Sequence, residues 1–343
     1  MEILNFLKSH YQQNDDGIYV ADVEGYWSNL NKEQNKALLA LLQHCSAREA
    51  LRERHPVFED VIFSPKRQAG LEILQLRGDE VCIDYGCMWG AITIPLAKRT
   101  KLVIGIDQTL ESLQFLKARM RDDGVNNVAL LRNNLREMPL LPVRALVDVA
   151  IVNGVLEWIP EVGVIELGVY YGKHHEKTYS GNPGEQQELF LRRVFENLNE
   201  KGKLYLAIEN RFDFKMFFGI NDPHSNIMFT TVAPRKLANL ISMKKLGRPY
   251  VNWVYSFNGI NSLLKKIGFS KVDLYRCSPD YRFPESIVPQ DHQMDNSRLI
   301  NSWRNEKGKI TFRRAGARIA EFLLKRVLKI KTLAPSIIAI GYK

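Results

Sequence analysis

The chain has 343 residues, of which 45% are hydrophobic and 25% are charged, and its formal net charge is +10. This composition is ordinary for a soluble globular protein and allows one large domain with attachments, or two modest domains. No apolar run approaches the length of a transmembrane helix, and the four cysteines form no CxxC pair. We therefore expect a cytoplasmic protein with no zinc site and no disulfide framework.

The first part of the chain has a polar, helix-like pattern and predicts a helical N-terminal cap over residues 1–63. Ser64 and Pro65 then supply an N-cap and a proline at the first helical position, and Gly78 is expected to end that helix. A helix therefore leads into the first buried strand.

Short apolar runs alternate with helical patterns over residues 80–210. Helices are expected over residues 91–99, 110–121 and 186–198. Strands are expected over residues 80–84, 101–107, 127–132, 146–152 and 203–209. This alternation predicts βαβ units and a mostly parallel sheet. Ligands of such sheets bind beyond the carboxyl ends of the strands, where this chain places Asp84, Asp107, Asn133 and Asn153.

The turn after the first strand carries two glycines, Gly86 and Gly90, whose missing side chains let a ligand approach the backbone. Dinucleotides and S-adenosylmethionine both bind against such a turn. A dinucleotide fingerprint needs G-x-G-x-x-G, but Met88 and Ala91 stand at its second and third glycines. The methionine would obstruct a pyrophosphate, so the pattern weighs against NAD. Asp107 cannot discriminate, because both ligands offer ribose hydroxyls to an acidic residue.

The segment Asp84-Tyr85-Gly86-Cys87-Met88-Trp89-Gly90 resembles motif I of the class I S-adenosylmethionine-dependent methyltransferases. Residues 148–158 resemble motif IV of the same family, and residues 198–204 resemble its entry to the fifth strand. The resemblance implies S-adenosylmethionine as the cofactor, with its ribose held by Asp107. The cofactor-binding residues that it implies are Asp84, Tyr85, Gly86, Cys87, Gly90, Asp107, Gln108, Asn133, Asn134, Leu135, Asn153, Gly154 and Val155.

The fold that the resemblance implies is an α/β, doubly wound, Rossmann-like sheet of seven strands. Its strand order would be 3-2-1-4-5-7-6, with the last strand antiparallel. The methyltransferase domain would cover residues 64–343, after the helical N-terminal cap. Two insertions are expected within it, an acceptor-side insertion over residues 210–255 after strand five and another over residues 278–332 after strand six.

A narrower resemblance covers residues 153–290 and includes Asp222-Pro223-His224-Ser225 and Pro279-Asp280-Tyr281-Arg282-Phe283-Pro284. These segments resemble a bacterial subgroup of methyltransferases that is associated with glycosyltransferases and surface-glycan biosynthesis. The resemblance implies a sugar hydroxyl of a cell-surface glycan, or of its lipid-linked precursor, as the methyl acceptor. A tRNA or small-molecule methyltransferase is one alternative, and a non-catalytic relative that binds the cofactor is another.

A hydroxyl acceptor needs a general base, and two residues beyond the fourth strand are candidates. His224 is the preferred base, because it lies in a polar loop and an imidazole titrates near neutral pH. The alternative for His224 is a loop histidine that only makes structural hydrogen bonds. Glu209, at the end of the fifth strand, is the second candidate, unless it pairs with Arg211 or Arg235.

Other polar and aromatic residues fall near the expected site. Glu157 and Trp158 are expected to border the pocket, although Trp158 also suits core packing. His174 and His175 lie in a loop over residues 170–184. Adjacent histidines match no familiar ligand spacing, so a mobile lid is expected there and no metal site.

Residues 311–331 combine apolar side chains at helical spacing with many lysines and arginines. Such a basic amphipathic helix suits an anionic membrane, which predicts peripheral contact with the inner face of the cell membrane. The alternative is that its apolar side packs on the domain while its charges are solvated. Nucleic acid is not expected as a partner, because the basic residues are not interleaved with aromatic residues. The sequence does not predict the oligomeric state.

Overall fold

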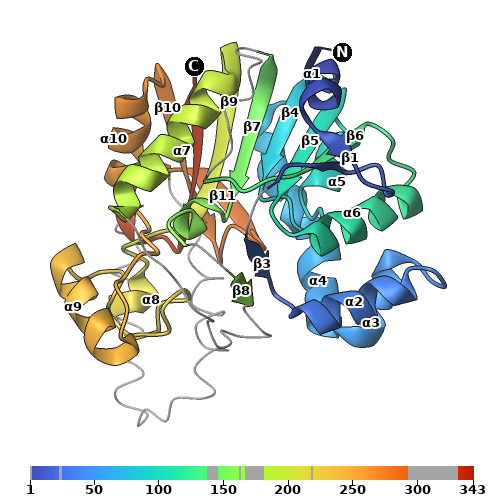
Figure 1. Ribbon diagram of the computed structural model, residues 1–343. Coiled ribbons are helices and arrows are strands. Elements are labelled where there is room, and N and C mark those ends of the chain that lie inside the picture. Colours follow the sequence, from blue (N-terminus) through green and yellow to red (C-terminus); the bar gives the residue numbers. More distant parts are fainter. Residues whose placement is uncertain are drawn as a thin grey trace.

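The computed structural model describes residues 2–22, 25–136, 146–161, 164–166, 181–217, 219–292 and 331–343. Its centre is a ten-stranded sheet with helices on both faces (Figure 1). From one edge to the other, the strands are β1 (Gln12–Gln13), β2 (Tyr19–Val20), β6 (Val128–Arg132), β5 (Leu102–Asp107), β4 (Val81–Tyr85), β7 (Val147–Asn153), β9 (Leu198–Glu209), β12 (Ser336–Tyr342), β10 (Lys271–Ser278) and β11 (Ser286–Pro289).

The inner part of the sheet is parallel from β2 through β6, β5, β4 and β7 to β9. Strand β12 runs antiparallel to both of its neighbours, β9 and β10. The edge strands β1 and β11 are also antiparallel to the strands beside them. The expected count of seven strands is wrong, because β1, β2 and β11 extend the sheet. These three strands are two to four residues long, too short for a sequence pattern to indicate.

Helices connect the strands and also form parts of the chain that lie away from the sheet. The α-helices are α1 (Glu2–His10), α2 (Lys32–Leu41), α3 (Ala47–Arg54), α4 (Pro56–Phe63), α5 (Thr93–Ala97), α6 (Leu110–Asp122), α7 (Pro183–Asn197), α8 (Phe214–Phe217), α9 (Arg235–Leu246) and α10 (Phe257–Ile267). The 3-10 helices are η1 (Pro65–Leu74), η2 (Leu156–Trp158) and η4 (Lys331–Leu333).

Alternating residues of each strand enter two apolar cores, one on each face of the sheet. On one face, α1, α7 and α10 pack against strand residues such as Ile83 and Val152. On the other face, η1, α5 and α6 pack against residues such as Val103 and Ile151. The central strands are therefore buried on both sides, as expected for a parallel sheet with helical crossovers.

The expected helix after Ser64 differs from the structure in type and length. The Ser64 hydroxyl accepts a hydrogen bond from the backbone N–H of Lys66, so the predicted N-cap is confirmed. The helix is a 3-10 helix and ends at Leu74, because Gln75 adopts a left-handed conformation with φ of 49°. Gly78 therefore lies beyond the helix that it was expected to end.

Residues 1–63, expected to be a helical cap, contain helices α1–α4 and also strands β1–β3. Strand β2 pairs with β6 at the sheet edge, and β3 (Tyr26–Ser28) pairs in parallel with β8 (Val164–Glu166) in a separate two-stranded sheet. Helices α2, α3 and α4 form a third core around Trp89, whose ring lies 5.6 Å from that of Phe58. This part of the chain therefore packs against the turn after β4.

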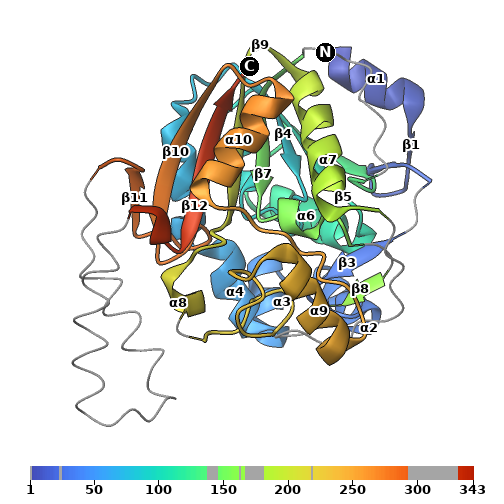
Figure 2. The same cartoon turned by 90° about the vertical axis from the view of Figure 1, so that its left-hand side faces the viewer.

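Both views place α2–α4 and α8–α9 at the same end of the sheet (Figures 1 and 2). The parallel strands end there, whereas both chain termini lie at the opposite end. The segments before β4 and after β9 therefore enclose the edge at which such sheets bind ligands. No helix in the described part of the chain is long and apolar enough to cross a membrane.

Candidate active site

The turn between β4 and α5 depends on two glycines with positive φ, Gly86 at 71° and Gly90 at 77°. A Cβ atom on Gly86 would lie 2.6 Å from Cγ2 of Val155, and one on Gly90 would lie 2.2 Å from Cδ1 of Leu116. Met88 between them also has a positive φ, 46°, although it carries a side chain. The turn therefore keeps the backbone shape of a glycine-rich loop at a position where methionine replaces glycine.

Asp107, the last residue of β5, joins this turn to the neighbouring strand. One carboxylate oxygen accepts a hydrogen bond from the backbone N–H of Met88 at 2.8 Å, and the other accepts one from Thr109 at 2.9 Å. The side chain is only 6% exposed but lines the cavity described below. Burial raises the pKa of Asp107 to about 6, despite these hydrogen bonds.

Asp84 lies near the end of the central strand β4. Its carboxylate accepts a hydrogen bond from the Thr93 hydroxyl at 2.6 Å. Burial raises the pKa of Asp84 to about 7, and the negative charge of Asp107 acts in the same direction. The Asp84 carboxylate is therefore poorly solvated, and a cationic group of a ligand would find it with little competing water.

A cavity of about 450 Å³ opens beyond the carboxyl ends of β4, β5, β7 and β9. Most of the residues expected to bind the cofactor line it: Asp84, Gly86, Cys87, Asp107, Gln108, Asn134, Leu135, Asn153, Gly154 and Val155. Because its position matches the strand ends, this cavity is the candidate active site.

Three residues expected at the cofactor do not line the cavity. The Tyr85 side chain points into the core, where its hydroxyl accepts a hydrogen bond from Asn197 at 3.0 Å. Gly90 faces Leu116 of α6, and Asn133 is fully buried. Successive strand residues point to opposite faces, so Tyr85 cannot share the orientation of Asp84.

The opposite wall of the cavity carries His224, from the loop between α8 and α9. Its Nδ1 lies 3.1 Å from a carboxylate oxygen of Asp222. Asp222 is itself fixed by hydrogen bonds from the hydroxyls of Ser225, at 2.6 Å, and Thr230, at 3.2 Å. The imidazole is therefore held through Nδ1, and its Nε2 faces the remaining groups of the site.

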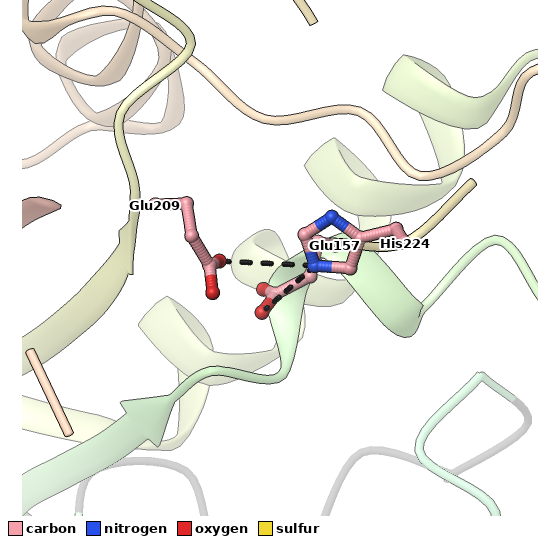
Figure 3. Close-up of side chains that lie close together, drawn as sticks. All are labelled: Glu157, Glu209 and His224. Carbon is pink, nitrogen blue, oxygen red and sulfur yellow. Dashed lines mark ion pairs between the residues drawn. The ribbon is translucent and has the colours of Figure 1, made fainter. Parts of the chain in front are cut away.

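Two carboxylates approach Nε2 of His224 from different elements (Figure 3). The nearest oxygen of Glu157, in η2, and that of Glu209, at the end of β9, each lie 3.8 Å from Nε2. An ion pair of Glu209 with Arg211 or Arg235 was the expected alternative, but these two arginines donate hydrogen bonds elsewhere. Arg211 donates to the carbonyl oxygens of residues 231 and 233, and Arg235 donates to that of residue 254.

The charges of this cluster shift the pKa values of its members. Burial opposes a charge on His224, but the carboxylates of Asp222, Glu157 and Glu209 outweigh it and raise the pKa of His224 well above its ordinary value. Burial, together with the charge of Glu209, raises the pKa of Glu157 to about 7. Burial would raise the pKa of Asp222, but its hydrogen bonds from His224 and Ser225 prevail and lower it. The surrounding carboxylates therefore favour the protonated form of the imidazole.

Several residues of the cavity were not singled out from the sequence. Trp27 and Arg67 line it from segments that carry no motif, and only the fold brings them there. Tyr281 lines the cavity and Asp222 holds His224 beside it, but no role was predicted for either residue. Trp158 lines the cavity and packs against His224, with ring centroids 5.0 Å apart, so it borders the site rather than only filling the core. His174, His175 and residues 311–330 lie outside the described residues.

Comparison with known families finds a match to the part of the chain that carries this site. Residues 76–233 match the model of a family described as a methyltransferase domain. This region is a class I S-adenosylmethionine-dependent methyltransferase domain. It contains the turn after β4, the end of β5 and all three members of the cluster, Glu157, Glu209 and His224.

Two curated relatives are named as uncharacterized RNA methyltransferases. The one from a Nostoc species is 28% identical over 95 residues, which are 25% of this chain and 21% of the relative. The one from Clostridium tetani is 31% identical over 74 residues, 22% of this chain and 15% of the relative. The matched region thus spans about a fifth of these relatives or less.

Solved methyltransferases give weak structural matches over most of the chain. A S-adenosylmethionine-dependent methyltransferase from Mesorhizobium loti has a TM-score of 0.45 and 13% identity, covering 82% of this chain and 100% of that chain. Phosphoethanolamine N-methyltransferase 2 from Haemonchus contortus also has a TM-score of 0.45 and 13% identity, covering 87% of this chain and 60% of that one.

Proposed function

We propose that the protein transfers a methyl group from S-adenosylmethionine to a hydroxyl group, and that this hydroxyl belongs to a sugar of a cell-surface glycan or its lipid-linked precursor. The observation that carries the proposal is the shared cavity. The cofactor-side carboxylates Asp84 and Asp107 and the cluster of Glu157, Glu209 and His224 all line it. A methyl donor and a proton-accepting group can therefore meet in one enclosed space.

The cofactor-side wall fits S-adenosylmethionine. The Asp107 carboxylate has lone pairs left for the ribose hydroxyls after accepting its two backbone hydrogen bonds. The side-chain oxygen of Asn153 is buried at the cavity and accepts no hydrogen bond from the described residues, so it and Asp84 can receive the amino group of the methionine end. When bound, the cofactor supplies a methyl group already activated by a positively charged sulfonium.

The chain's own contribution to transfer is to place the acceptor oxygen and to take its proton. With the cofactor bound, the acceptor oxygen would bond to the methyl carbon as the sulfur–methyl bond breaks, and the electron pair of that bond would stay on sulfur. The hydroxyl proton passes to a basic group of the chain. Because the surrounding carboxylates favour a proton on His224, and Nε2 lies 3.8 Å from Glu209, we propose Glu209 as this base and His224 as the group that positions it.

The residues on the acceptor side of the cavity favour a hydroxyl over an amine as the methyl acceptor. A neutral amine needs no base for methyl transfer, whereas a hydroxyl does. Trp27, Trp158 and Tyr281 add aromatic surface to the cavity, and such rings combine an apolar face with a polar edge. This mixture suits a sugar ring, which has apolar C–H faces and hydroxyls around its rim.

RNA is the second candidate acceptor, because both curated relatives are named as RNA methyltransferases. Their similarity covers only about a quarter of this chain, so the acceptor side can differ between the proteins. We also retain, as a proposal from the sequence alone, that residues 311–331 contact an anionic membrane, where a lipid-linked acceptor would be found.

The experiment that tests the proposal supplies one methyl donor to competing acceptors. The full-length protein and radiolabelled S-adenosylmethionine are incubated with lipid-linked glycan precursors, with mature surface glycan or with total RNA. Label is expected in a glycan fraction, with Glu209→Gln as the control that binds cofactor but transfers poorly. Label in RNA alone would replace the glycan proposal with the second candidate.

A further inference from the structure

Glu157, Glu209 and His224 bring three potential metal ligands together in the cavity. One atom from each, a carboxylate oxygen or the imidazole Nε2, lies within 4.8 Å of the other two (Figure 3). They come from η2, the end of β9 and the loop before α9, which are separate elements of the fold. Only the tertiary structure creates the cluster. The three residues have no metal-binding spacing in the sequence, and no metal site was expected.

Glu157 shows that this cluster is not satisfied by the protein alone. The residue is 0% exposed, and neither of its carboxylate oxygens accepts a hydrogen bond from the described residues, although one lies 3.8 Å from Nε2 of His224. The buried Glu209 oxygen that faces His224 also lacks such a bond. Buried carboxylates normally receive hydrogen bonds or coordinate a cation, because an unpaired buried charge is costly.

The balance of charge within the cluster is negative. Three carboxylates, those of Asp222, Glu157 and Glu209, surround the single imidazole of His224. Among the described residues, Tyr281 also lies near the two glutamates, and Arg67 and Arg282 lie near Tyr281 and line the same cavity. Within the cluster itself, carboxylates outnumber the single imidazole three to one. A bound cation would reduce this excess.

The hydrogen bond between His224 and Asp222 is also the arrangement that metal-binding histidines require. A ligating imidazole usually donates its second N–H to a carboxylate, which fixes the tautomer and the ring orientation. Here Nδ1 faces Asp222 at 3.1 Å, while Nε2 is left facing the two glutamates. The same negative surroundings that favour a proton on Nε2 favour a metal ion in its place.

We propose that Glu157, Glu209 and His224 bind one divalent metal cation, Mn²⁺ or Mg²⁺, on the acceptor side of the cavity. Two carboxylate oxygens and one imidazole are the donor set, and the hard carboxylate oxygens suit these ions. Three protein ligands leave the remaining positions of an octahedral ion open to water or to acceptor oxygens.

The distances are compatible with such an ion after a small contraction. In an octahedral site with bonds of about 2.1 Å, neighbouring ligand atoms lie about 3.0 Å apart and opposite ones about 4.2 Å apart. The two separations from Nε2 of His224, 3.8 Å each, fall between these values, and all three ligand atoms lie within 4.8 Å of one another. Each side chain therefore needs to move by less than about an ångström.

The catalytic role of this ion rests on the proposed function, whereas its binding does not. A divalent cation beside the acceptor hydroxyl would stabilise the negative charge that develops on the oxygen as its proton leaves. Glu209 can bind through one carboxylate oxygen and accept the proton with the other. The ion would then orient neighbouring oxygens of an acceptor with adjacent hydroxyls, which a sugar provides.

The test measures Mn²⁺ binding directly. The full-length protein, freed of metals with a chelator, is titrated with Mn²⁺, and the electron paramagnetic resonance signal of the free ion reports the bound fraction. The proposal predicts saturable binding of a single ion without cofactor or acceptor. Glu157→Gln and Glu209→Gln should each weaken it by about tenfold or more, and Asp222→Asn by about 10–100-fold through the imidazole.

Glu161→Gln is the matched control, because Glu161 lines the same cavity but pairs with Arg248, 3.7 Å away. This variant should bind Mn²⁺ as the wild type does. Unchanged binding of S-adenosylhomocysteine shows that each variant is folded, and it separates this test from that of the methyltransferase activity. The absence of saturable Mn²⁺ binding in the wild type, or equal binding in Glu157→Gln, would overturn the proposal.

Discussion

The protonation of Asp107 should control binding of the nucleoside part of the cofactor. If its carboxylate accepts hydrogen bonds from the ribose hydroxyls, binding needs the ionised form. Burial raises the pKa of Asp107 to about 6. The ionised fraction is then about nine-tenths at pH 7 and about one-tenth at pH 5, so affinity should fall by up to about tenfold over this range.

The assay uses 5′-methylthioadenosine, which has the ribose and adenine of the cofactor but lacks its amino acid. This choice separates Asp107 from Asp84, whose pKa is raised to about 7 and which we place at the methionine end. Isothermal titration across the pH range should give weaker binding as pH falls. Asp107→Asn should bind weakly at every pH and lose the pH dependence.

The fold should tolerate this pH range. A carboxyl whose pKa is raised in the folded state takes up a proton on acidification while its unfolded counterpart stays ionised, so stability rises as pH falls from about 7 toward 5. Asp84 and Asp107 both act in this direction. An affinity that stays constant from pH 7 to pH 5 in the wild type would refute the assignment of Asp107 to the ribose.

Three further predictions concern the base, the turn and the basic segment. Glu209→Gln should lower kcat by about 10²-fold or more, with S-adenosylhomocysteine affinity nearly unchanged; near-normal turnover would remove Glu209 from the chemistry. Gly86→Ala should destabilise the protein by about 1–3 kcal/mol in urea unfolding, because the new Cβ would lie 2.6 Å from Val155, and Val155→Ala in the same chain should restore part of the loss. If residues 311–331 bind membranes, the protein should sediment with anionic vesicles but not neutral ones, and increasing salt should release it; no sedimentation at low salt would end that proposal.

The sequence predicted the centre of the fold because its strands are long and apolar. Strands β4, β5, β6 and β7 each lie within about one residue of their expected ranges. The edge strands β1, β2 and β11 escaped prediction because they are short and their pairing depends on neighbours far away in the chain. The 3-10 geometry of η1 was also hidden, since its signals are shared with an α-helix.

The cofactor side of the site was predictable for a topological reason, whereas the acceptor side was not. Parallel strands end at one edge, so Asp84 and Asp107 had to lie near each other. Glu157 and His224 meet only because the segment after β9 folds back over η2, as the hydrogen bond from Asn252 to the Glu157 carbonyl oxygen shows. No local pattern indicates that contact, and the pKa of His224 follows from it.

Following the methyl group itself tests the proposed glycan O-methylation most directly. The protein is incubated with trideuteromethyl S-adenosylmethionine and the lipid-linked glycan precursors of the source organism, and the products are analysed by mass spectrometry with fragmentation. If the proposed function is correct, a trideuteromethyl ether forms on a sugar oxygen, and its amount is strongly reduced with Glu209→Gln. Deuterium found on a nitrogen, on RNA or on no acceptor at all would contradict it.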